Sequence, residues 1–156
     1  MGQFCRGGRA KGMLILSLVV AIILTMSAVP AGAARAKTFI ALFNGGQEVP
    51  PTTSNALGVA FMTFDDKTKM LCYSITLSDG LGGETAAHFH GPADPGQNAD
   101  IVFAITPVPG RSKTGCVGPF LNGKQRSALK KGRFYANIHT QQFPNGEVRG
   151  QVLPTR

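Results

Sequence analysis

Apolar and polar residues alternate along most of this chain in short runs that end at Gly, Pro, Asn or Asp. Alternation with a period of two places successive side chains on opposite faces, which is typical of β-strands. The pattern predicts seven strands, over residues 38–43, 57–64, 70–77, 85–90, 101–105, 134–140 and 147–153. The only helical pattern lies over residues 121–131, and Gly132 follows at the position of a C-terminal cap.

Individual segments give more detailed expectations. In the third run, Leu71, Tyr73, Ile75 and Leu77 fall on one face and Cys72 on the other. The short polar segment 65–69 predicts a hairpin, and Pro144-Asn145-Gly146 predicts a turn between the last two strands. The apolar run 101–105 is typical of a strand that is buried on both faces.

These elements predict the fold class. Seven or eight short strands, one short helix and no internal repeat indicate an all-β protein, an antiparallel β-sandwich with Greek-key-like connections. A small barrel is the alternative, since the strand pattern does not separate the two architectures.

The N-terminus has the pattern of a targeting segment. Arg6, Arg9 and Lys11 precede an apolar run over residues 13–29, and Pro30 with the small residues 31–33 follows. We therefore expect a signal peptide at residues 1–33 and one domain at residues 34–156. An uncleaved N-terminal anchor is the alternative. With no second apolar run, the mature chain is not expected to span a membrane.

Removal of the signal peptide would change the net charge and the number of cysteines of the chain. The net charge of +8 falls to 8 − 3 = +5, because the three basic residues of the N-terminus are removed. Cys72 and Cys116 remain, and export to the periplasm or the medium would expose them to an oxidising compartment. Either a disulfide or two free thiols fits this sequence, because pairing depends on a distance that sequence does not give.

Three separated segments together resemble a known family. They are FIALFNGGQEVPP at 39–51, LCYSITLSDGLGGETAAHFHGPADPGQNADIVF at 71–103 and QRSALKKGRFYANIHTQQFPNGEVRGQV at 125–152. In combination they are similar to the CHRD domain, which is repeated in chordin and occurs singly in exported microbial proteins. The resemblance implies an extracellular or periplasmic module and no known enzymatic activity; it does not imply the two cysteines.

All three histidines lie in the segments that carry this resemblance. His88 and His90 are two residues apart, so an extended strand would direct both to one face, and His139 lies on a later strand. Neutral imidazole is a common ligand of copper and zinc, so the three predict a copper or zinc site if their strands are neighbours. Four acids are candidate oxygen donors or supporting residues: Glu84, Asp94, Asp100 and Glu147.

The histidine arrangement is also similar to the layout of copper-zinc superoxide dismutase, a Greek-key β-sandwich. His88 and His90 would match the paired copper ligands and His139 the late one. The bridging histidine and the histidine ligands of zinc have no counterpart here, because the chain has three histidines. This departure favours simple metal binding over redox disproportionation.

Other interpretations stay open. The histidines could instead hydrogen-bond to the backbone and hold the loop at 93–100. The function classes are then a non-enzymatic binding module with an unidentified extracytoplasmic partner, a metal-dependent oxidoreductase, and a structural envelope component. Basic residues around the helical segment suggest either a solvated face or an anionic cell-surface polymer as partner. Nucleic acid is not an expected partner, because no aromatic residues interleave the basic ones.

Overall fold

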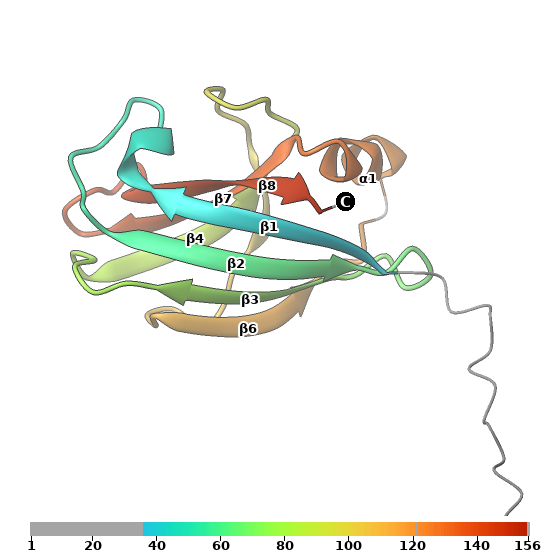
Figure 1. Ribbon diagram of the computed structural model, residues 1–156, viewed down its shortest axis with the longest axis horizontal. Coiled ribbons are helices and arrows are strands. Elements are labelled where there is room, and N and C mark those ends of the chain that lie inside the picture. The colour runs from blue at the N-terminus through green and yellow to red at the C-terminus, as the bar shows by residue number, and fades with distance from the viewer. Residues whose placement is uncertain (1–35, 121, 156) are drawn as a thin grey trace, which may run out of the picture. The chain divides into compact units, whose positions relative to one another are not determined.

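The computed structural model describes residues 36–120 and 122–155 (Figure 1). The elements are β1 (Lys37–Asn44), the 3-10 turn η1 (Gly45–Gln47), β2 (Leu57–Phe64), β3 (Leu71–Leu77), β4 (Glu84–His90), β5 (Ile101–Ala104), β6 (Ser112–Val117), α1 (Gly123–Lys130), β7 (Phe134–Thr140) and β8 (Val148–Pro154). The predicted signal peptide at residues 1–33 lies outside the described residues. Within the described ranges, no helix is long and apolar enough to cross a membrane.

The eight strands form one antiparallel sheet in the order β5-β4-β7-β8-β1-β2-β3-β6. In Figure 1, β1, β2, β3 and β6 lie side by side, and β4 and β7 pass behind them. The chain crosses from one half of the sheet to the other between β3 and β4, and crosses back between β5 and β6. The prediction of an all-β, Greek-key-like antiparallel sandwich is confirmed, and its two halves belong to a single, nearly closed sheet.

The core lies between the two halves and follows the alternation of the sequence. The β3 residues Leu71, Tyr73, Ile75 and Leu77 are buried, as the pattern predicts. Tyr73 meets Phe89 of β4 edge to face, with ring centroids 5.6 Å apart. Each such buried aromatic side chain contributes about 1.5–3 kcal/mol relative to an exposed one, so packing across the two halves keeps the sheet folded on itself.

Two strand predictions need correction. The strand β6 was not predicted, because Ser112–Val117 is mostly polar and lies at the end of the sheet with one neighbour, β3. The strand β5 was predicted to be buried on both faces, which is wrong, since Ile101 is 57% exposed. That strand is the opposite end of the sheet and pairs with β4 alone.

The helix α1 begins and ends as its sequence indicates. The side chain of Asn122 caps the N-terminus by accepting a hydrogen bond from the Lys124 amide at 2.8 Å. Gly132 follows with φ of 74°, a left-handed conformation that favours glycine. Nearby, Lys130 pairs with Asp66 and Arg133 with Asp94. These pairs offset part of the positive charge of the basic cluster.

Gln47 closes a gap in the sheet between β1 and β8. The two strands pair at Ile40 with Leu153 and again at Asn44 with Arg149, but not between these positions. There, the Gln47 side-chain amide donates to the Leu42 carbonyl at 2.6 Å and its carbonyl accepts from the Gln151 amide at 3.2 Å. The side chain thus substitutes for ladder hydrogen bonds, and it anchors the η1 loop to the sandwich.

A disulfide joins Cys72 of β3 to Cys116 of β6, which are direct partners in the strand register. The bond resolves the two alternatives that the sequence left open. It ties the terminal strand β6 to its single neighbour, and its sulfurs lie on the face of β3 opposite the core.

Removing this disulfide tests its contribution to stability. The bond links residues 44 positions apart, so it restricts the unfolded chain. We expect Cys72→Ala/Cys116→Ala to lower the free energy of unfolding by about 2–5 kcal/mol, measured by urea denaturation. The reduced wild-type protein is the control and should show the same loss. An unchanged midpoint in both would contradict a stabilising role.

Candidate metal centre

The three histidines lie together on the face of the sheet that points away from the core. His88 and His90 project from β4 on the side opposite Phe89, and His139 projects from the neighbouring strand β7. Because Ala86 pairs with His139, that residue lies diagonally from His88. The ring centroid of His139 is 4.9 Å from that of His88 and 6.4 Å from that of His90.

One nitrogen of each ring converges on a common point. The three nitrogens lie within 4.8 Å of one another. Two ligands of a metal with nitrogen bonds of about 2.0–2.1 Å are separated by at most about 4.2 Å. A single ion would therefore fit after the rings approach one another slightly, and it would have three nitrogen ligands and an open coordination position.

Backbone carbonyls orient two of the rings. His139 Nδ1 lies 3.0 Å from the Pro144 carbonyl and His90 Nδ1 lies 2.9 Å from the Ala99 carbonyl. A carbonyl oxygen only accepts, so both Nδ1 atoms carry the proton and donate. In a neutral ring, His139 Nε2 then keeps its lone pair, which is the form that binds a metal ion.

Two of the remaining ring nitrogens lack a hydrogen-bond partner. His139 Nε2 and His88 Nδ1 are buried and make no hydrogen bond to the described residues. His90 Nε2, by contrast, is hydrogen-bonded to the Asn137 side-chain amide at 3.0 Å, which would have to turn away for this nitrogen to bind a metal ion. Buried polar atoms without a partner are uncommon in folded proteins, because burial removes their hydrogen bonds to water. A metal ion bound at the cluster would give His88 Nδ1 and His139 Nε2 the partner that they lack.

Burial disfavours the charged form of His88 and His90. It lowers the pKa of His88 below 6.5, and the nearby His139 and His90 lower it further. It also lowers the pKa of His90, although hydrogen bonds to Ala99 and Asn137 act in the opposite direction. Neutral rings at physiological pH can accept a metal ion without first losing a proton.

Tyr135 and Arg149 stack in sequence against the His90 ring. The Tyr135 ring lies parallel to that of His90, with centroids 4.7 Å apart and an angle of 1° between planes. The guanidinium of Arg149 lies 3.4 Å from the centroid of the Tyr135 ring, in a cation–π contact. Asn137, Tyr135 and Arg149 were not predicted as site residues. The period of two along β7 could have identified the first two, because they share the face of His139.

The acids proposed as oxygen donors do not join the cluster. Within the described residues, the histidines form the only metal-ligand group, and none of the four acids belongs to it. Glu84 pairs with the buried Lys113, and Asp94 pairs with Arg133. Glu147 accepts hydrogen bonds from Ser54 and Thr140. Glu84, Asp94 and Glu147 therefore have structural partners outside the histidine cluster.

A comparison with protein families bears on the resemblance noted above. A family model described as the CHRD domain matches residues 39–152, which is most of the chain. The chain belongs to the CHRD family. No curated protein and no solved structure gives a significant match to it. The similarity of this CHRD domain to the layout of copper-zinc superoxide dismutase therefore stays a prediction.

A His88→Gln variant tests the ionisation of the metal-free cluster. Because the pKa of His88 is lowered in the folded state, the unfolded chain takes up the proton first as the pH falls below 6.5. Stability from neutral His88 is therefore present above that pH and is lost as the pH falls. Glutamine has no such ionisation, so the unfolding temperature of the variant minus that of the wild type should rise from about pH 7 to about pH 5.

Thermal unfolding followed by circular dichroism measures this difference. Other titrating groups are present in both proteins, so their effects cancel to first order. A difference that stays constant over the same pH range would show that the environment of His88 does not disfavour the charged ring.

Proposed function

We propose that this CHRD domain is an exported, non-enzymatic binding module that holds one copper or zinc ion between His88, His90 and His139. The observation that carries the proposal is the convergence of three imidazole nitrogens, two of them buried without a partner. The ligands sit on two hydrogen-bonded strands, so the backbone holds their spacing before the metal binds.

Export is the second part of the proposal. A disulfide between Cys72 and Cys116 is typical of oxidising compartments such as the periplasm or the medium. It agrees with the signal-peptide pattern at residues 1–33 and with the extracytoplasmic setting of the family. It also removes both thiols of the domain as competing metal ligands, which leaves the histidines as its strong nitrogen or sulfur donors.

Calorimetric titration of the purified, metal-free protein with Cu(II) and Zn(II) tests the site. We expect one equivalent to bind, with the disulfide intact. His139→Asn is the informative variant, because its side-chain amide can still donate to the Pro144 carbonyl while Nε2 is gone. Its affinity should fall by at least about 100-fold, more than the loss typical of a supporting residue.

The outcome separates the function classes. If His139→Asn and the wild type bind equally, or neither binds, the histidines hold the loop and the metal proposal is wrong. If metal binds and the protein also turns over superoxide or another redox substrate, the alternative of a metal-dependent oxidoreductase replaces the non-enzymatic module. Three nitrogen donors without an acid in the group would leave one coordination position open for a substrate, which is the reason to test for turnover.

A further inference from the structure

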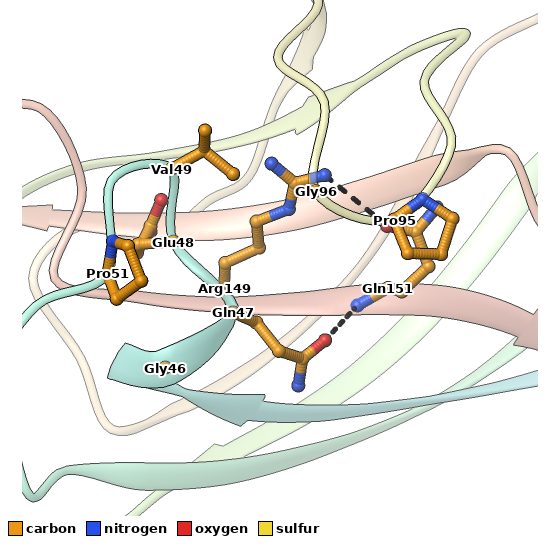
Figure 2. Close-up of a pocket in the computed structure, with 9 residues that line it drawn as sticks. All are labelled: Gly46, Gln47, Glu48, Val49, Pro51, Pro95, Gly96, Arg149 and Gln151. Carbon is orange, nitrogen blue, oxygen red and sulfur yellow. Dashed lines mark hydrogen bonds between the residues drawn. The ribbon is translucent and has the colours of Figure 1, made fainter.

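A pocket of about 430 Å³ lies on the same sheet face as the histidines, beyond Tyr135. Residues 46–49 and Pro51 form one wall, and Pro95 and Gly96 form the other. Figure 2 shows Arg149 rising from β8 between the two walls, with Gln151 and Gln47 beneath it. The volume lies in the range of small-molecule sites, which is about 300–1,000 Å³.

Arg149 gives the pocket a buried positive charge. The residue is only 1% exposed. Its Nη2 donates to the Gln97 carbonyl at 2.8 Å and to Gln151 Oε1 at 3.4 Å, and its Nη1 donates to Asn98 Oδ1 at 3.3 Å. All of these acceptors are neutral, and Arg149 makes no ion pair with any residue that the structure describes. A buried guanidinium without a counter-ion is costly, so an incoming anion would be stabilised here.

Glu48 supplies a second unsatisfied group. It is 6% exposed, and its Oε1 is buried with no hydrogen-bond partner among the described residues. Gly146 lies so close that a Cβ there would be 2.5 Å from Oε1, which limits where the carboxyl can move. Burial raises the pKa of Glu48 to about 7, even though Arg149 and the Val49 backbone act to lower it. A neutral Glu48 carries a proton that it can donate to a ligand.

The amides of the pocket already have partners. Gln47 bridges β1 and β8, as described above. Gln151 Nε2 donates to the Ala93 carbonyl at 3.0 Å and to the Gly132 carbonyl at 2.8 Å. Val49, Pro51 and Pro95 contribute apolar surface. Arg149 keeps two N–H hydrogens beyond the three hydrogen bonds given above, so it and Glu48 are the groups left to bind a polar ligand.

We propose that this pocket binds the carboxylate of a small acidic ligand, with Arg149 supplying the positive charge and Glu48 a hydrogen-bond donor. The three hydrogen bonds above leave one Nη1 hydrogen and the Nε hydrogen of Arg149, and a carboxylate could accept from either. A carboxylate also carries a single negative charge, which matches the single charge of Arg149. A dianion such as phosphate would be disfavoured, because one buried cation beside an acid does not offset two charges. The carboxylate belongs either to a free acid or to the carboxyl terminus of a peptide.

The proposal does not depend on metal binding at the histidines. Arg149 reaches the pocket from β8, while the convergent nitrogens belong to β4 and β7. The experiment therefore uses protein freed of metal by a chelating resin, so that a carboxylate cannot report on a bound ion.

NMR titration of the purified protein with sodium acetate is the test. We expect saturable shifts of the side-chain signals of Arg149, Gln47 and Gln151. Arg149→Gln should weaken acetate binding by about tenfold or more, since it removes a charge-assisted hydrogen bond. Glu48→Gln should bind acetate at least as tightly as the wild type, because it replaces an ionisable acid with a neutral donor. Arg133→Gln, which removes a partly exposed arginine paired with Asp94, is the matched control and should bind as the wild type does.

Trialanine and its C-terminal amide distinguish the two sources of the carboxylate. Binding of the free peptide alone, more tightly than acetate, would assign a peptide terminus, and equal or weaker binding would assign a free acid. The proposal is overturned if acetate does not saturate, if phosphate binds more tightly, or if Glu48→Gln loses acetate binding. If Arg149→Gln does not fold, the wild-type shifts and the Glu48→Gln titration still decide the result.

Discussion

The side chains of β4, β7 and β8 that point away from the core are largely polar, yet the structure buries most of them. Polar groups are buried at little cost only when they are hydrogen-bonded. The loop at residues 91–100 meets that requirement by turning its backbone carbonyls toward the sheet. Ala93, Gln97 and Ala99 accept from Gln151, Arg149 and His90 respectively.

This buried polar layer accounts for both candidate sites. The same carbonyls that satisfy the layer also fix the direction of its side chains, so the free nitrogens and charges are held in place before any ligand arrives. Tyr135 occupies the centre, with the His90 ring parallel to its own and the Arg149 guanidinium against its ring. The few polar atoms that the loop leaves without a partner are then the expected points of contact with a metal ion or a small ligand.

This CHRD domain keeps the interactions that stabilise it apart from the buried polar layer. The core packs between the halves of the sheet, and the disulfide holds the terminal strand β6 to β3. The core lies on the opposite face of the sheet from the polar layer, and the disulfide lies on different strands from it. Ligand binding at the proposed sites would therefore leave the interactions that hold the domain together intact.

The sequence by itself determined the all-β class, seven of the eight strands and the shared direction of His88 and His90, because these depend on a local period of two. It missed β6 and misjudged the burial of β5, because position within a sheet is not a local property. The proximity of His139 to that pair, the pairing of Cys72 with Cys116 and the meeting of Glu48 with Arg149 were decided by the tertiary structure alone. Each depends on strand order and register across long separations in the chain, which are set by how the whole sheet buries its core.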